Sequence, residues 1–394
     1  MEKNITITRV DIKESETITK NKKIRSSNFE LLRIFAIFMI IIFHIVYHCV
    51  NFQLTDTASI ARMNNGLFCN PVWYKKLLIL ELAIPLGVIG NGIFMLISGY
   101  FLVEKNGGTE GIYKTAKRLI SQLLFATLIL LVFSALYHHF NRNVFTNLID
   151  IQSFNNMSWY IGYYFLTIVI ADLFLNKYLN KFSKQQYFTL LITLFAIISF
   201  SWTRGLLEII GGGLATLCTG VFLYSLGGYI KKYNPFEKIH TYVFFINILI
   251  IVALLSLSFH NVVINNILNY KREGATGQFI QNIPIFDNYS YIVIIISVCL
   301  LEIFKRIKIK NYKVINYIGA STFMIYLIHD NAFFYSWWGN IDWITLLYNS
   351  PILFIGKLLL YTLFTFALGF IAYVLYKIIM KIIAKLKLSC IFKP

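Results

Sequence analysis

The chain has 394 residues, of which 57% are hydrophobic and 14% are charged, and its mean hydropathy is +0.65. Soluble domains are about half apolar and about a quarter charged, so this composition excludes a soluble multidomain enzyme and a disordered protein. The 36 basic residues outnumber the 18 acidic ones. They stand in short clusters between apolar runs, which is typical of membrane topology and excludes a nucleic-acid groove. The composition predicts a polytopic membrane protein.

Apolar stretches recur along the whole chain after a polar N-terminal segment. We expect residues 1–28 to be a cytoplasmic tail, residues 29–379 to form one transmembrane domain, and residues 380–394 to be a basic cytoplasmic tail. The fold class we expect is all-α, because apolar runs of this kind cross about 30 Å of hydrocarbon as helices. The ten predicted spans are residues 29–50, 77–103, 119–137, 159–176, 187–203, 206–230, 239–259, 289–304, 314–338 and 351–379.

The distribution of Lys and Arg predicts the orientation of these spans. With both termini in the cytoplasm, the inner segments hold 27 basic residues and the outer segments hold 7. This is the bias that the positive-inside rule describes. One span more or fewer would invert every later loop and remove the bias, so the distribution also favours an even number of spans.

The first span carries two ionisable residues on one stripe. Arg33 and His44 are eleven residues apart, so in a helix they differ by about 20° in direction and by roughly 16 Å in height. Alone, Arg33 is typical of a snorkelling arginine, and His44 of a buried histidine that a neighbouring helix satisfies. His48 follows at a spacing that also suits a metal. The sequence shows no third ligand with metal spacing, so we expect no metal site.

Depth in the membrane predicts which groups lie near the two ends of this stripe. His329 and His44 are each about fifteen residues from the inner end of their spans, which corresponds to roughly 22 Å. Glu81 enters its span from the outside and reaches a comparable level. These three groups are therefore candidates for one polar pocket.

The inner end of the stripe has its own candidate partners. Arg33 is matched in depth by Ser98 and by the basic pair Lys117 and Arg118, which begins the third span. An ordinary positive-inside cluster would look the same.

Five motifs that follow one another along residues 28–330 resemble the signatures of the integral-membrane acyltransferase-3 family. They are Leu31-Leu-Arg33 with Phe43-His44, Phe94-Met-Leu-Ile-Ser98-Gly99-Tyr100, Ser158-Trp159-Tyr160, Tyr224-Ser-Leu-Gly227-Gly228-Tyr229, and Gly319-Ala-Ser321-Thr-Phe-Met-Ile-Tyr326-Leu-Ile-His329. The chain departs from the family at the Arg-x-x-Arg of the inner loop, because Ser121 stands three residues after Arg118.

The resemblance implies a membrane-bound O-acyltransferase in a bacterial plasma membrane. Such an enzyme takes an acetyl or larger acyl group from cytoplasmic acyl-CoA, a donor substrate and not a bound cofactor. It passes the group to a hydroxyl of an extracytoplasmic carbohydrate of the cell envelope, such as a polysaccharide or a lipid-linked oligosaccharide. The expected partners are thus membrane lipid, acyl-CoA and a carbohydrate acceptor, with no nucleic acid.

Residue roles follow from this resemblance together with side-chain chemistry. Arg33, Lys117 and Arg118 are expected to pair with the CoA phosphates. His44 is expected to act as general base, with a covalent acyl-histidine as the second alternative. Ser98 and Gly99 either bind the donor or pack helices.

Four aromatic or polar residues are candidates for the acceptor side, and Glu81 is one of them. Trp159 is either an interface anchor or a platform on which a sugar stacks. Tyr326 and His329 are expected to orient the acceptor or the base.

Two other protein classes have a similar composition. A transporter or flippase for a lipid-linked saccharide would share the spans and the basic inner loops, but it does not explain the Arg33–His44 stripe. A membrane scaffold or signalling protein explains none of the buried charges.

Overall fold

The computed structural model describes residues 25–55, 71–105, 108–137, 159–273 and 290–391. Helices make up most of these residues, and no strand occurs among them. The helices, with π-helical turns marked η, are α1 (Ser27–Ile45), η1 (Val46–Val50), α2 (Asn51–Thr55), α4 (Pro71–Ala83), α5 (Pro85–Leu102), α6 (Gly108–Tyr137), α9 (Trp159–Ile170), η3 (Ala171–Leu175), α10 (Asn176–Lys181), α11 (Lys184–Ser199), α12 (Ser201–Ile210), α13 (Leu214–Tyr233), α14 (Thr241–Glu273), α15 (Tyr291–Arg306), α16 (Lys313–His329), α17 (Ala332–Gly339), α18 (Trp343–Asn349) and α19 (Pro351–Ile391).

The all-helical fold class is confirmed, and several helices suit a membrane. Each of the ten predicted spans overlaps at least one helix. Among the described residues, five helical segments are long and apolar enough to cross a bilayer, or six if α11 and α12 form one bent span. These observations make the chain a multi-pass membrane protein. The number ten and the cytoplasmic position of the termini stay predictions.

Helix breaks fall inside several predicted spans, including the one over residues 206–230, where residues 211–213 separate α12 from α13. The span predicted over residues 187–203 is interrupted at Phe200, where extended backbone separates α11 from α12 with a bend of 78°. The span predicted over residues 314–338 is interrupted after His329, because the side chain of Asn331 accepts hydrogen bonds from the backbone of Phe333 and Phe334 and starts α17. A side chain that caps a new helix ends the preceding run whatever its hydropathy.

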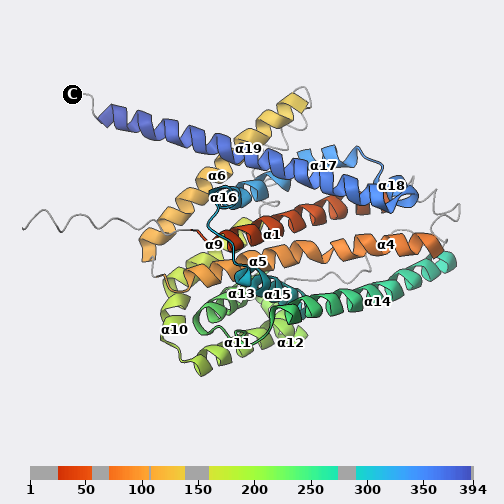
Figure 1. The fold of residues 1–394 in the computed structure, drawn as a ribbon, viewed down its shortest axis with the longest axis horizontal. Coiled ribbons are helices and arrows are strands. Elements are labelled where there is room, and N and C mark those ends of the chain that lie inside the picture. Colours follow the sequence, from red (N-terminus) through yellow and green to blue (C-terminus); the bar gives the residue numbers. More distant parts are fainter. Residues whose placement is uncertain (1–24, 56–70, 106–107, 138–158, 274–289, 392–394) are drawn as a thin grey trace, which may run out of the picture.

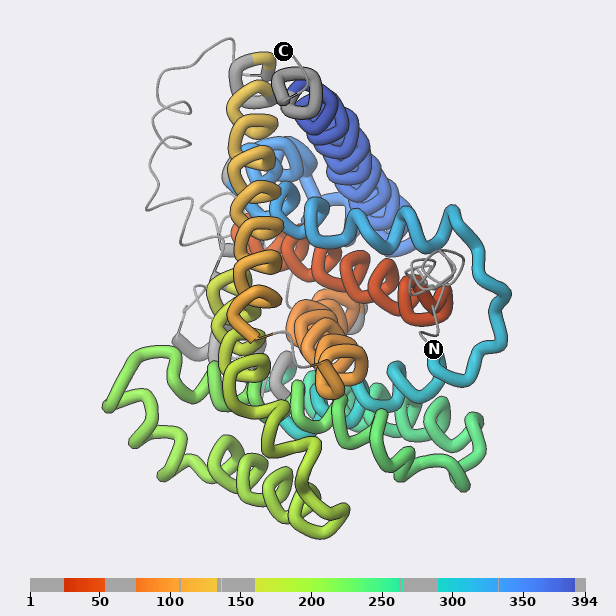
Figure 2. The backbone as a smooth tube through the Cα atoms, turned by 90° about the vertical axis from the view of Figure 1, so that its left-hand side faces the viewer, coloured from red at the N-terminus to blue at the C-terminus, as the bar shows by residue number. Residues whose placement is uncertain are grey.

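The centre of the bundle is α5, which packs against α1, α13 and α15. Figure 2 shows the α4–α5 segment almost end-on in the middle of the molecule, with α1 beside it. Glycines allow the closest approach, since a Cβ on Gly99 would lie 1.8 Å from the carbonyl oxygen of Tyr224, and one on Gly227 would lie 2.1 Å from that of Leu96. The α5–α13 interface is therefore a contact of backbone on backbone, as small residues permit between membrane helices.

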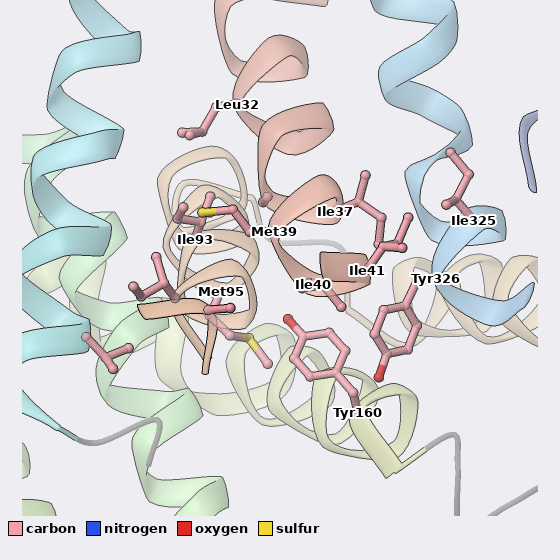
Figure 3. Close-up of a cluster of buried hydrophobic side chains, with 14 of the residues drawn as sticks. Leu32, Ile37, Met39, Ile40, Ile41, Ile93, Met95, Tyr160, Ile325 and Tyr326 are labelled. Carbon is pink, nitrogen blue, oxygen red and sulfur yellow. The ribbon is translucent and has the colours of Figure 1, made fainter. Parts of the chain in front are cut away.

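Helix α1 lies between α5 on one side and α16 and α19 on the other. Its first turn and the C-terminal end of α19 lie at the same end of the bundle (Figure 1). Buried side chains of α1, including Ile37, Ile40 and Ile41, pack near Tyr326 of α16 and Tyr160 of α9 (Figure 3). Both ends of α1 are thus surrounded by other helices, and the candidate site is built around this one element.

Candidate functional site

A histidine–aspartate pair forms the part of the site at the C-terminal end of α1. His44 Nδ1 of α1 lies 3.1 Å from Asp330 Oδ1, and both side chains are mostly buried, at 13% and 8% exposure. Tyr335 of α17 donates its hydroxyl proton to the same carboxylate oxygen. Within the described residues the geometry gives His44 Nδ1 no hydrogen bond, so the pair is a close contact between an imidazole nitrogen and a carboxylate oxygen. A carboxylate at this position favours the tautomer that carries its proton on Nδ1 and leaves Nε2 free to accept one.

The end of α16 explains how Asp330 reaches His44. The helix ends at His329, and Asp330 leaves the helical conformation with φ −95° and ψ 77°. Asn331 then begins α17 and also donates from its side chain to the carbonyl of Ile328. The carboxylate of Asp330 therefore sits at a corner between two helices, from which it faces α1.

His329 and Tyr326 lie next to this pair. The rings of His44 and His329 are 4.9 Å apart and nearly perpendicular, and the ring of Tyr326 lies 5.3 Å from that of His329. His329 is fully buried, and its Nδ1 lies 2.8 Å from the carbonyl oxygen of Tyr326. Its Nε2 has no hydrogen-bond partner in the part of the chain that the structure describes. Such a buried polar atom is costly unless a ligand or water satisfies it. The structure thus brings together His44 and His329, which the sequence places at one depth.

His48 belongs to the same cluster. It lies in the π-helical turn η1, and its ring stacks on that of Tyr335 at 4.0 Å and on that of His44 at 5.4 Å. Turns of this type inside α-helices are frequent at functional sites. Ligand atoms of His44, His48 and Asp330 all lie within 4.8 Å of one another. Asp330 is therefore a third potential ligand, which the sequence spacing does not reveal.

The N-terminal end of α1 carries an arginine–glutamate cluster. Glu30 Oε1 accepts from Arg33 at 2.7 Å and from Arg25 at 3.3 Å. Glu30 is 3% exposed, whereas the side chain of Arg33 is 25% exposed. A Cβ on Gly319 of α16 would lie 2.4 Å from Glu30 Oε2. The absence of a side chain at Gly319 leaves the space that Glu30 occupies, and Glu30 in turn orients Arg33.

The candidate donor-binding residues divide into exposed and packed groups. Lys117 and Arg118 of α6 are exposed, and Tyr373 of α19 lies within electrostatic range of both Arg25 and Arg118. Ser98 is buried, and its hydroxyl donates to the carbonyl of Phe94 at 2.8 Å.

Gly99 and the position of the second arginine in the family motif both take part in contacts between helices. Gly99 is in backbone contact with α13. Ser121, which replaces the second arginine of the family motif, lies 3.0 Å from the hydroxyl of Tyr376. Helix packing accounts for both positions, so within the donor group the exposed cations are the ones open to a ligand.

The remaining acceptor candidates lie apart from this centre or outside the described side chains. Glu81 of α4 is 1% exposed, and among the described residues no hydrogen bond or ion pair joins it to His44 or His329. Trp159 is the first residue of α9, and its side chain is outside the described ones. The next residue, Tyr160, contacts Tyr326 ring to ring at 5.2 Å.

A surface cavity of about 480 Å³ lies on the far side of this aromatic contact. It is lined by α9 and by the loop between α12 and α13, with Tyr163 and the glycines at 211–213 among its residues. Tyr163 contacts Tyr160 at 5.4 Å between ring centroids. Since no residue of α1 or α16 lines the cavity, it is separate from the His44 centre.

Three contributors to the site are missing from the candidates that the sequence suggests, namely Glu30, Asp330 and Tyr335. Glu30 stands one helical turn before Arg33, a spacing at which opposite charges pair. Asp330 directly follows the motif that ends at His329. Tyr335 gives no sequence signal, because its contact depends on the break at Asn331.

Comparison with known proteins yields one match. The model of a protein family described as an acyltransferase domain matches residues 26–389. No curated protein and no solved structure matches the chain.

Proposed function

Because the chain belongs to the acyltransferase-3 family, whose model spans residues 26–389, it is an acyltransferase, and we propose a specific reaction for it. The enzyme transfers an acyl group, acetyl in the first instance, from cytoplasmic acyl-CoA to a hydroxyl of an extracytoplasmic or lipid-linked carbohydrate. The observation that carries the proposal is the His44–Asp330 pair in a mostly buried site. This is the arrangement that a general base needs in order to activate a hydroxyl.

The proposed step is direct transfer. Nε2 of His44 takes the proton of the acceptor hydroxyl while the oxygen attacks the thioester carbonyl carbon. The new C–O bond forms, the C–S bond breaks, and the departing CoA sulfur receives the proton from the imidazolium. Asp330 stabilises that imidazolium from the Nδ1 side, and Tyr335 holds the carboxylate in place.

The donor end of the reaction depends on Arg33. Its NH1 group pairs with Glu30 at 2.7 Å, and a guanidinium has five N–H donors in all, so donors remain for a phosphate oxygen. Arg118 and Lys117 add positive charge on α6, which packs against α16 and α19. The phosphates of CoA then bind near the inner end of α1, and the pantetheine arm extends along the helices toward His44.

The proposal requires that the Arg33 end of α1 face the cytoplasm of a bacterial plasma membrane. Reporter fusions after Lys184, at the start of α11, and after Lys313, at the start of α16, should therefore report a cytoplasmic position. The reason is that both positions lie in loops that the basic-residue bias assigns to the inside. Periplasmic reports from both fusions would show that the orientation is reversed.

The decisive experiment compares the O-acyl content of surface polysaccharides, by NMR, in cells that have the protein, lack it or carry His44→Ala. We expect O-acyl groups only with the wild-type protein. A transporter or flippase would instead change the amount of polysaccharide and leave the acylated fraction of the remainder unchanged. Equal acylation in all three strains would refute the proposal.

A further inference from the structure

We propose that His44, His48 and Asp330 form a site for a divalent transition-metal ion of the Zn²⁺ type, and that the bound ion stops acyl transfer. The site itself is argued from the ligand geometry alone. The inhibition rests on the function proposed above for His44.

The donor set and its geometry suit zinc. Two imidazole nitrogens and one carboxylate oxygen, with a fourth position left for water, are a common zinc ligand set, with ligand distances of about 2.0–2.2 Å. At tetrahedral angles such ligands lie about 3.4 Å from one another. Here His44 Nδ1 and Asp330 Oδ1 are already 3.1 Å apart, and the whole set spans at most 4.8 Å. An adjustment of somewhat more than 1 Å, mainly at His48, completes the site.

The surroundings of the three ligands favour a cation. Asp330 is a mostly buried carboxylate, and among the described residues it contacts a histidine and a tyrosine and forms no ion pair with a Lys or Arg. A buried anion without a permanent cationic partner is electrostatically costly, and a divalent ion removes that cost. Tyr335 contributes further, because it donates to Asp330 and stacks on His48 at 4.0 Å. Outer contacts of this kind orient metal ligands.

Metal binding is incompatible with the base role of His44. If the ion occupies Nδ1, which faces Asp330, the neutral ring carries its proton on Nε2. That nitrogen then has no lone pair for the acceptor hydroxyl. His48 contributes to the metal site but has no part in the proposed transfer, so it separates the two properties experimentally.

The experiment uses the purified full-length protein in detergent and ZnCl₂ as the probe. Zinc affinity is measured by competition with a chromophoric chelator for wild type, for His48→Ala, and for His240→Ala as a matched control that removes an exposed imidazole far from the site in sequence. We expect His48→Ala to weaken the tightest zinc site by at least tenfold, since even outer-contact changes weaken metal sites by about 10–100-fold. His240→Ala should leave that site unchanged. Equal zinc affinity in wild type and His48→Ala would overturn the site.

The second arm measures transfer from labelled acetyl-CoA in membranes, with and without ZnCl₂. Zinc should inhibit the wild type and His240→Ala, whereas the transfer that His48→Ala retains should resist zinc. Undiminished transfer by a zinc-saturated wild type would overturn the inhibition. If the wild type showed no transfer at all, the proposed function would fail, while the binding measurements would still decide the zinc site.

Discussion

Replacing Asp330 by Asn tests the role of the carboxylate that contacts His44. The substitution keeps the shape of the side chain and an oxygen that can accept from Tyr335, but it removes the negative charge. We therefore expect the protein to fold and insert normally and to lose rate. The loss arises because the imidazolium that forms during transfer is no longer stabilised from the Nδ1 side.

The separation of the two side chains sets the size of the effect. Two unit charges 3.1 Å apart attract by about 5 kcal/mol at an effective dielectric constant of about 20. Since 1.36 kcal/mol corresponds to a factor of ten, this limits the loss to about four decades. The amide keeps a hydrogen-bonding group beside Nδ1 and recovers part of that energy. We expect the transfer rate of Asp330→Asn to fall by about a hundredfold to a thousandfold.

The assay is the initial rate of label transfer from acetyl-CoA to the polysaccharide fraction of membranes with equal amounts of each protein. Asp342→Asn is the matched control, because Asp342 accepts from the backbone of Thr345 as the N-cap of α18 and Asn is an equally good cap. That variant should keep the wild-type rate. A rate for Asp330→Asn within threefold of the wild type would refute the role of the carboxylate.

Three further substitutions test other parts of the reasoning. His44→Ala should lower the transfer rate by at least about a hundredfold, which is the scale of removing a positioned proton acceptor. Its affinity for acetyl-CoA, measured separately, should persist, and loss of that affinity would contradict the base role. Arg33→Ala should abolish acylation and weaken directly measured acetyl-CoA binding without loss of membrane insertion, and Arg33→Lys should restore part of the activity as a point charge. Full activity of the alanine variant would exclude a donor-binding role. Gly227→Ala should lower the free energy of unfolding of the purified protein by about 1–3 kcal/mol or more, because its Cβ would lie 2.1 Å from a backbone oxygen of α5. Gly356→Ala should not lower it, because a Cβ there would meet no other described atom within 4 Å outside its own helix turn. Equal melting temperatures of the two variants would contradict the packing argument.

The sequence predicts the helices of this fold better than their ends. Each of the ten apolar stretches overlaps a helix, because hydropathy over a window of 17 to 25 residues records the need to satisfy the backbone in lipid. The break at Asn331 falls at three consecutive polar residues, His329, Asp330 and Asn331, inside an apolar stretch that we predict as one span, so a count of apolar residues alone passes over it. It depends on a side chain that caps α17, and this cap positions Asp330.

The sequence predicts how deep the candidate site residues lie along their helices, but not which neighbouring helix each side chain faces. Counting residues from the inner end places His44 and His329 at one depth, and the structure brings their rings to 4.9 Å. The same argument includes Glu81, for which no contact with either histidine is described. Depth along a helix says nothing about which neighbour the helix face meets, and that is decided by tertiary packing such as the glycine contacts between α5 and α13. The roles of these residues stay predictions.

Because α1 is a regular helix between Arg33 and His44, it fixes both the distance and the relative direction of these two side chains. Over Ser27–Ile45 it is uninterrupted α-helix, and the π-helical turn begins only after His44. A one-residue insertion between the two would turn His44 by about 100° relative to Arg33, while four residues would nearly restore the direction and add about 6 Å. With the roles proposed for Arg33 and His44, the length of this segment sets the distance that a bound donor has to span.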